Sequence, residues 1–265
     1  GFEVRDERIR STKLGKLLPE DEWQTTGGHD GQDDVLYKYR DQRANVSAFL
    51  EHDVLLKQWT VSLGLMANLN DGLDTKWRFY PGIDVSYRPT EAWKFFVSWN
   101  MGLRMPTFTD LYYSGANIEG NSELKPEKTT DYQIGGRYTT RGFIAEVQGF
   151  YSHKKNMIDW VTYNDANKVS DGIFHSVNFQ MDNKGAEINL QMLPRQLWGD
   201  NALVRKIGVQ YSYIYEESDY DVDLIMSKYA MDYLRHKVIV SADSKIWKNL
   251  NLSLSWRWQD REGKN

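Results

Sequence analysis

The stretch WNMGLRMPTFTDLYYSGANIEGNSELKPEK, residues 99–128, decides the fold of this chain. Apolar and polar residues alternate before it, in residues 93–101, and after it, in residues 130–138. This period of two is typical of a half-buried β-strand. Between the two runs lie Pro106, Pro126 and a Gly-Asn corner, and proline and glycine interrupt strands. The stretch therefore predicts two strands joined by a long connection.

The same alternation recurs along the whole chain, in about eleven runs. The clearest covers residues 59–70, where Trp, Val, Leu and Ala alternate with Thr, Ser, Gly and Asn. It is longer than the strands of about 5–6 residues that are usual in globular proteins. A tilted strand that crosses a membrane needs about 9–11 residues. The run lengths therefore favour membrane-spanning strands over a soluble β-sandwich.

The predicted connections alternate between short and long. The short ones fall at residues 53–57, 88–92, 139–142, 194–203 and 246–249. The long ones fall at residues 11–37, 69–77, 104–127, 163–175 and 217–229. Aromatic residues make up 14% of the chain, with 10 Trp and 16 Tyr, many of them near the ends of the runs. Short turns on one side, long loops on the other and aromatic girdles are typical of outer-membrane barrels. We predict an all-β protein, a transmembrane antiparallel up-and-down β-barrel over residues 1–265.

Composition excludes several other classes of protein. No apolar run approaches the roughly 20 residues of a membrane helix, and residues 1–10 hold no signal-peptide core. The charges on the polar strand faces have mixed signs and the net charge is −4, so no basic face suits nucleic acid. The five His residues lie on separate segments, and no Gly-x-Ser-x-Gly or phosphate-binding motif occurs.

The opening stretch resembles the barrel of TonB-dependent outer-membrane receptors. Residues 103–113, LRMPTFTDLYY, are similar to a Phe-Arg-x-Pro-(Thr/Ser)-(Phe/Leu)-x-(Asp/Glu)-Leu-(Tyr/Phe) block of that family. Residues 120–127, GNSELKPE, are similar to its Gly-Asn-Pro-x-Leu-Lys-Pro-Glu block. Leu103 replaces Phe and Ser122 replaces Pro. The strand that begins Tyr132-Gln133-Ile134-Gly135 also matches.

The resemblance implies a 22-stranded barrel filled by an N-terminal plug. About eleven strands are present here, so we expect residues 1–265 to be a portion of the C-terminal half of such a barrel, without the plug or the final strands. It also implies active import of a scarce nutrient across the bacterial outer membrane, and no enzymatic activity. The implied partners are the plug, the remaining strands, the nutrient and the TonB-ExbB-ExbD energy-coupling system. A surface lipoprotein is left open as a further partner.

Two segments, residues 77–89 and 157–160, look most like the cobalamin-receptor-like branch, including homologues from Bacteroidota. This similarity implies a corrinoid as the first candidate ligand. A siderophore or haem receptor is the alternative within the family, although residues 104–124 lack the His that haem receptors usually carry there. The alternative from another class is an outer-membrane barrel enzyme or adhesin, for which no catalytic cluster is visible.

The candidate ligand-binding residues lie in the predicted outer loop. They are Arg104, Thr107, Phe108, Tyr112, Tyr113 and Asn117. Arg104 would shape a substrate passage or, in the interpretation that we favour, would form ion pairs with lumen carboxylates beside the strand end at Pro106. Tyr112 and Tyr113 would stack on a flat ligand. The interpretation that we favour for both is packing within the loop or in an aromatic girdle.

A candidate calcium site lies in a second predicted outer loop. Asp219, Asp221 and Asp223 alternate there, and carboxylate oxygens are ligands that Ca²⁺ prefers. The segment has no EF-hand pattern, so a solvated acidic loop is the favoured interpretation. No other cofactor is expected.

Overall fold

The described residues form one large, mainly antiparallel sheet and a separate two-stranded sheet of residues 24–26 and 35–37. The computed structural model describes residues 1–26, 35–72, 74–163, 172–199, 201–219, 224–228, 233–247 and 249–262. The long strands of this described part, in the order in which they lie side by side, are β1 (Phe2–Ser11), β5 (Tyr39–Leu56), β6 (Trp59–Asn70), β7 (Asp74–Tyr87), β8 (Trp93–Arg104), β11 (Glu127–Thr139), β12 (Phe143–Tyr163), β13 (Phe174–Met192), β14 (Val204–Asp219), β16 (Tyr233–Lys245) and β17 (Asn251–Glu262). Their spatial order follows the chain order, which confirms the up-and-down arrangement and the all-β class.

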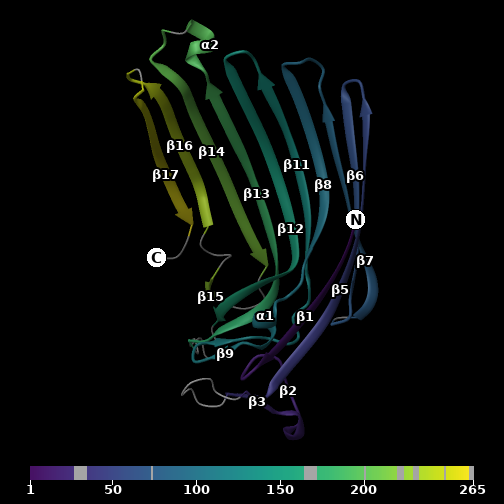
Figure 1. Cartoon of the computed structure of the whole chain (residues 1–265). Helices are drawn as coiled ribbons and strands as arrows, with labels where there is room; N and C mark the ends of the chain where they lie inside the picture. Colours follow the sequence, from purple (N-terminus) through teal and green to yellow (C-terminus); the bar gives the residue numbers. More distant parts are fainter. Residues whose placement is uncertain are drawn as a thin grey trace.

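The sheet curves into a trough whose two ends differ (Figure 1). Tight turns and α2 (Pro194–Trp198) lie at the upper end in this view, while α1 (Phe108–Tyr112), β2 (Lys16–Leu17), β3 (Gln24–Thr26) and β9 (Ser114–Gly115) lie at the lower end. The other short elements are η1 (Glu20–Glu22), β4 (Val35–Tyr37), β10 (Ile118–Glu119) and β15 (Leu224–Ser227). Neither described helix is long and apolar enough to cross a membrane. We call the end with the long connections the loop end.

Two predicted connections differ from the structure. The short turn predicted at residues 53–57 lies at residues 57–58, because β5 continues to Leu56. The other difference is larger. The sequence predicts a long loop over residues 69–77, but β6 continues to Asn70 and β7 begins at Asp74. The Asn70 side-chain oxygen accepts a hydrogen bond from the Gly72 amide (3.0 Å), and an Asx turn of this kind reverses the chain locally. The Asp71 carboxylate accepts a second bond from the Ala44 amide of β5 (2.6 Å). The Asn-Asp-Gly sequence therefore forms a tight hairpin.

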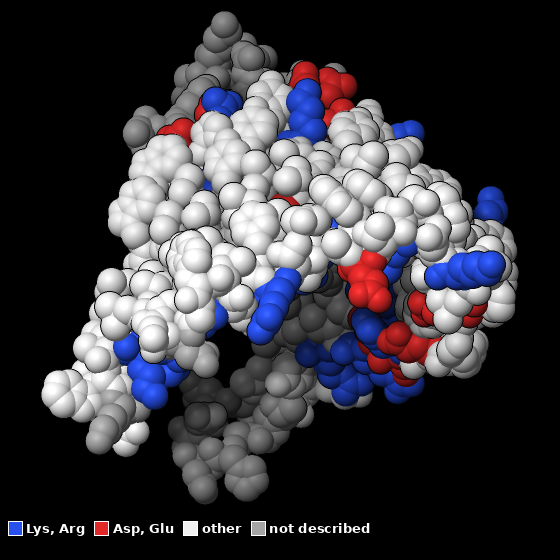
Figure 2. All heavy atoms as spheres, turned by 90° about the horizontal axis from the view of Figure 1, so that it is seen from above, with Lys and Arg blue, Asp and Glu red and all other residues white. Residues whose placement is uncertain are grey.

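The concave and convex faces of the sheet have opposite polarity. Register partners share a face, and polar residues form two rows on the concave face. One row is Ser62, Asp84, Ser98 and Gln133, on β6, β7, β8 and β11. The other is Gln148, Glu187, Ser212, Lys237 and Gln259, on β12, β13, β14, β16 and β17. The neighbouring row on the convex face includes Val61, Val85, Val97 and Ile134. Figure 2 shows the charged side chains gathered mainly in the hollow, below a convex surface that is mostly uncharged. A polar lumen and an apolar outer wall are what a membrane barrel requires.

Aromatic rings mark two levels on the convex face. Trp59 stacks on Tyr87, and Trp93 lies against Tyr138, at the end with the tight turns. At the other level, Trp99, Tyr132 and Tyr151 are register partners on β8, β11 and β12. Trp93 and Trp99 are six residues apart, or about 20 Å at about 3.3 Å per residue. That separation approaches the apolar band of about 25 Å that aromatic girdles enclose in outer-membrane barrels. We call the row of Trp99, Tyr132 and Tyr151 the outer aromatic row.

Candidate functional site

Residues 105–126 connect the neighbouring strands β8 and β11. This connection also contacts β5 on one side and β13 on the other, which lie far apart in the sheet, so we call it the bridging loop. Its single helical turn, α1, begins with a capping box. The Thr107 hydroxyl accepts a hydrogen bond from the Asp110 amide (3.1 Å), and the Asp110 carboxylate accepts one from the Thr107 amide (2.9 Å). Two otherwise unpaired N–H groups at the helix start are satisfied in this way. The Thr-Phe-Thr-Asp sequence therefore sets the conformation of the helix start.

Arg104, the last residue of β8, joins the bridging loop to β11 and β12. Its guanidinium lies 3.5 Å from the Asp110 carboxylate and 3.4 Å from the carboxylate of Glu127, the first residue of β11. It also donates to the carbonyl of Ile158 on β12 (3.4 Å). These contacts confirm the interpretation in which Arg104 forms ion pairs with carboxylates on the concave side. Asp110 is far more buried than Arg104, so the ion pair compensates a carboxylate that has little contact with water.

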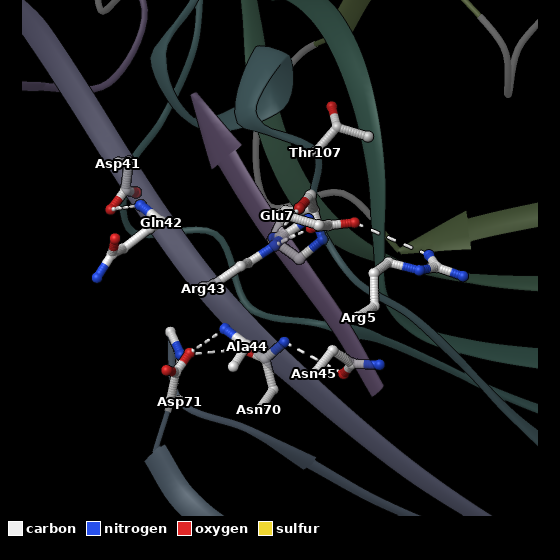
Figure 3. Close-up of polar contacts among 12 residues, drawn as sticks. Arg5, Glu7, Asp41, Gln42, Arg43, Ala44, Asn45, Asn70, Asp71 and Thr107 are labelled. Atoms are coloured by element: carbon white, nitrogen blue, oxygen red, sulfur yellow. Dashed lines mark hydrogen bonds and ion pairs between the residues drawn. The ribbon is translucent and has the colours of Figure 1, made fainter. Parts of the chain in front are cut away.

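A second arginine, Arg43 of β5, holds the other side of the bridging loop against β5. Its side chain is only 10% exposed and forms an ion pair with Glu7 of β1. It donates to the carbonyl of Pro106 (2.6 Å), and its guanidinium carbon lies 4.8 Å from the centre of the Phe108 ring. Figure 3 shows Arg43 and Glu7 pointing toward one another, with Arg5 on the other side of Glu7. The planar guanidinium thus forms an ion pair with a carboxylate, a hydrogen bond to a backbone oxygen and a contact with an aromatic face at the same time.

Tyr112 provides a second contact with β5. Its hydroxyl donates to the carboxylate of Asp41 (2.6 Å), which also lies 3.5 Å from the ammonium of Lys16. Burial, and then the hydrogen bond to Asp41, raise the pKa of the Tyr112 phenol well above its usual value. The phenol therefore stays a neutral donor over the physiological range. Its ring also lies against Phe108, with the ring centres 6.4 Å apart.

The other side of the loop is fastened to β13. Strand β10 pairs in parallel with the start of β13, and the Phe174 amide donates to the Asn117 carbonyl (2.9 Å). The Asn178 side chain forms two bonds with Lys125: it accepts from the amide (2.7 Å) and donates to the carbonyl (3.0 Å). The loop is therefore anchored at both sides of the trough, to β5 and to β13.

A cavity of about 720 Å³ lies between the bridging loop and the wall formed by β5 and the β6–β7 turn. Its lining residues are Lys16, Asp41, Gln42, Arg43, Asn70, Asp71, Gly72, Met105, Pro106, Phe108, Leu111, Tyr112, Tyr113, Ser114, Glu119, Gly120, Ser122, Glu123 and Leu124. Aromatic rings come from the loop, and amide and carboxylate groups come mainly from the wall. Such a mixture binds a ligand through its apolar faces and orients it through its polar groups.

The structure places the predicted ligand-binding residues in three settings. Phe108, Tyr112 and Tyr113 line the cavity, and Tyr113 is the most exposed of the three. Thr107 and Arg104 stabilise the loop from within, outside the cavity lining. Asn117 is exposed, and its carbonyl joins the contact with β13. Sequence reasoning missed Asp41, Arg43 and Asn178, because each is an ordinary polar residue of a strand and its partner lies more than 50 residues away.

The predicted calcium site lies mostly outside the described residues. Asp219 is the last residue of β14, whereas Asp221 and Asp223 are not among the residues that the structure describes. Within the described part of the chain, no group of three or more His, Asp or Glu side chains is placed to hold a metal ion. Calcium binding by these three residues stays a prediction.

Comparison with known proteins gives the same fold. The family described as TonB dependent receptor-like, beta-barrel matches residues 10–265. The vitamin B12 transporter BtuB of Photobacterium profundum is 23% identical over 211 residues, which are 68% of this chain and 34% of that transporter. BtuB of Vibrio vulnificus is 31% identical over 72 residues, 27% of this chain and 11% of that protein.

Solved structures agree at the level of the fold. The siderophore receptor PirA of Acinetobacter baumannii has a TM-score of 0.66 and 12% identity, over 97% of this chain and 38% of that receptor. A mutant of the ferric enterobactin receptor PfeA of Pseudomonas aeruginosa has a TM-score of 0.65 and 16% identity, over 97% of this chain and 38% of that one. The chain thus spans about a third of the length of the first transporter and about two fifths of these receptors. It belongs to the family of TonB-dependent receptor β-barrels, which are receptors and transporters of the Gram-negative outer membrane rather than enzymes.

Proposed function

We propose that this chain forms part of the barrel wall and a ligand-facing loop of a receptor that binds cobalamin or a related corrinoid and imports it with energy supplied through TonB. The observation that carries the proposal is the cavity of about 720 Å³ beneath the anchored bridging loop. Its size falls within the range of about 300–1,000 Å³ that small-molecule sites occupy. It lies at the loop end of the strands, where an outer-membrane receptor meets its ligand.

The chemistry of the cavity suits a corrinoid. A corrinoid has a broad, flat ring system edged with amide groups. Exposed Tyr113 offers a face on which such a ring can stack, and Asp41 and Gln42 offer acceptors and donors for its amides. The likeness to two vitamin B12 transporters supports this ligand class. A corrinoid exceeds this cavity, so we assign its remaining contacts to the plug and to other outer loops.

The mechanism that we propose is the one general to the family. Outer loops capture the ligand, the plug fills the lumen against the polar concave wall, and the TonB-ExbB-ExbD system moves the plug to open a path. The described wall supports such a fit because neighbouring polar groups form chains across strands. The Gln133 amide, for example, donates to the Gln148 side chain (2.8 Å). The lipoprotein partner and the Bacteroidota branch stay predictions.

A siderophore is the second candidate ligand. Siderophore receptors are among the solved structures with a similar fold, and PirA and PfeA each align with 97% of this chain. The cavity also carries Lys16 and Arg43, which would attract an anionic ferric siderophore. Haem is less favoured, because no described residue of the cavity lining is a His that could bind its iron.

Ligand binding to the full-length receptor tests the proposal. We expect cyanocobalamin to bind the purified receptor with nanomolar affinity in isothermal titration calorimetry, and a ferric siderophore and haem not to compete. Tyr113→Ala should weaken binding about fivefold, since one aromatic stacking contact is worth about 1 kcal/mol. Tyr37→Ala removes a tyrosine at the same end of the molecule but outside the cavity lining, and should bind as the wild type does.

Two results would overturn the ligand assignment. Tight binding of a ferric siderophore with no binding of cobalamin would select the second candidate. Equal cobalamin affinity of the Tyr113→Ala and Tyr37→Ala variants would show that the cavity is not part of the binding site. Energy coupling is tested separately in cells, where a protonophore should abolish uptake of labelled cobalamin and leave surface binding intact.

A further inference from the structure

Two lysines lie side by side on the convex face near the loop end. Lys128 of β11 and Lys155 of β12 are direct register partners, and both are exposed. Glu127, the residue before Lys128, contacts Arg104 on the concave side. Because successive strand residues point to opposite faces, Lys128 and its partner Lys155 lie on the convex face. Like charges directly opposite each other on a sheet are unfavourable, so this pair gains from a shared anion.

Their level relative to the membrane follows from the outer aromatic row. Lys128 is four residues from Tyr132, and Lys155 is four residues from Tyr151, on the same two strands. Four residues span about 13 Å along a strand, on the side away from the apolar band. Lysine stems lie along apolar surface while their ammonium groups reach toward water or headgroups. Both ammonium groups can therefore reach the headgroup layer.

Neighbouring charges on the same face are already matched. The Asp182 carboxylate accepts from the Tyr151 hydroxyl (2.9 Å) and contacts His153 (2.6 Å). The Lys184 ammonium lies 3.9 Å from Glu217 and 4.8 Å from the centre of the Tyr215 ring. No ion pair or hydrogen bond joins the ammonium groups of Lys128 or Lys155 to another of the residues that the structure describes.

We propose that Lys128 and Lys155 bind the phosphate group of a phosphorylated lipid of the outer leaflet. Two ammonium groups on adjacent strands can hold one phosphate between them, and each Lys near a membrane surface typically adds about 1 kcal/mol of attraction to anionic lipid. Met101 and Leu103, the register neighbours of Thr130 and Lys128 on β8, offer apolar contact beside the phosphate. The site depends on the membrane placement of the barrel and not on the identity of the nutrient.

Lipid retention by the full-length receptor tests this site. The receptor is reconstituted with bis-phosphorylated lipid A or with the same glycolipid after removal of its phosphates, and bound lipid is measured by native mass spectrometry. The double variant Lys128→Gln/Lys155→Gln should bind phosphorylated lipid A about 30-fold more weakly, which corresponds to about 1 kcal/mol for each lysine. Binding of the dephosphorylated lipid should be the same for both proteins.

Matched variants separate charge from folding. Lys128→Arg/Lys155→Arg keeps both charges and should retain the lipid. Lys125→Gln removes one exposed lysine of the bridging loop and should also retain it. If the double Gln variant does not fold, each single Gln variant should weaken binding about fivefold.

Three results would overturn the proposal. One is equal retention of phosphorylated lipid A by the Gln variants and the wild type. A second is equal loss of the phosphorylated and dephosphorylated lipids. The third is displacement of lipid A by excess inorganic phosphate, which would indicate a site for free phosphate instead of a lipid site.

Discussion

Arg43 shows how much of the site depends on the geometry of one side chain. Its guanidinium contacts Glu7, the Pro106 carbonyl and the face of Phe108, which come from β1 and from the bridging loop. A lysine ammonium could reach one of these groups but not all three, because it lacks the planar fork of donors. The chemistry of arginine, and not only its charge, therefore joins the loop to β5.

We accordingly predict that Arg43→Lys and Arg43→Met both release the loop from β5. The loss of a hydrogen bond from a charged donor costs about 2 kcal/mol, so amides of the loop such as those of Gly120 and Asn121 should exchange with solvent about 30-fold faster. Hydrogen–deuterium exchange on the full-length receptor measures this. Arg40→Lys alters an exposed arginine that bonds only to Gln42 among the described side chains, and should leave the loop unchanged. Loop amides that exchange at the wild-type rate in Arg43→Met would show that the loop does not depend on the contacts of Arg43.

Tyr112 and Tyr113 are neighbours for which we predict different effects of the same change. Tyr112→Phe removes the hydroxyl that bonds to Asp41, and should cost about 1 kcal/mol of loop stability, seen as about fivefold faster loop exchange. Tyr113→Phe keeps the ring of the more exposed residue and should change neither loop exchange nor cobalamin affinity. Similar exchange rates in the two variants would contradict the assigned role of the Asp41 bond.

At the scale of the element, the bridging loop depends on a close backbone approach at Gly120. The Gly120 amide donates to the Tyr113 carbonyl (2.6 Å), and the Asn121 amide donates to the Asp110 carbonyl (3.0 Å). A Cβ at residue 120 would lie 2.9 Å from the amide nitrogens of Tyr112 and Tyr113 and 3.0 Å from the Asp110 carbonyl oxygen. These are backbone atoms, which cannot rotate away as a side chain can.

Gly120→Ala should therefore disrupt the loop without unfolding the barrel. We expect a loss of cobalamin binding of about tenfold or more, because overpacking costs typically about 1–3 kcal/mol. Gly102→Ala is the control, since a Cβ there has its nearest contact at 3.9 Å, with the Thr129 Cβ. Calorimetric titration of both variants measures the difference, and full binding by Gly120→Ala would contradict the packing argument.

The strands could be predicted from the sequence because the alternation of apolar and polar residues can be read from consecutive residues. The period of two in residues 59–70 predicts β6, and its bounds match. The Asn-Asp-Gly hairpin at Asn70 was missed because its polar residues look like loop, although two of their side chains form the turn bonds. The β8–β11 loop was predicted from its prolines and its family resemblance. Its contacts with Asp41 and Arg43 could not be predicted, because no local pattern links residues that far apart.

At the scale of the whole molecule, the two faces of the sheet should differ in how much stability they lose when a positive charge is added. Val97 lies on the convex face, 48% exposed, and Ser98 lies on the concave face between Asp84 and Gln133. Val97→Arg should destabilise the membrane-inserted receptor by about 2–4 kcal/mol, the cost of an arginine on the lipid face near the bilayer centre. Ser98→Arg should cost far less, because Asp84 is beside it.

The yield of folded receptor in the outer membrane, followed by denaturant titration in lipid vesicles, measures these two substitutions. Equal destabilisation by Val97→Arg and Ser98→Arg would contradict the assignment of the faces.

The anchoring of the bridging loop at both sides also sets an order of assembly. The Tyr112–Asp41 contact joins residues 71 apart, and the Lys125–Asn178 contact joins residues 53 apart. Most register partners on neighbouring strands are closer together in the chain than this, so these two contacts close longer loops and are expected to form later. Asn178 also follows the loop in the chain, so the loop cannot dock fully until β13 has been added to the growing wall. During insertion, the loop therefore docks only after the strands from β5 to β13 have come together, so this part of the barrel mouth stays open until then.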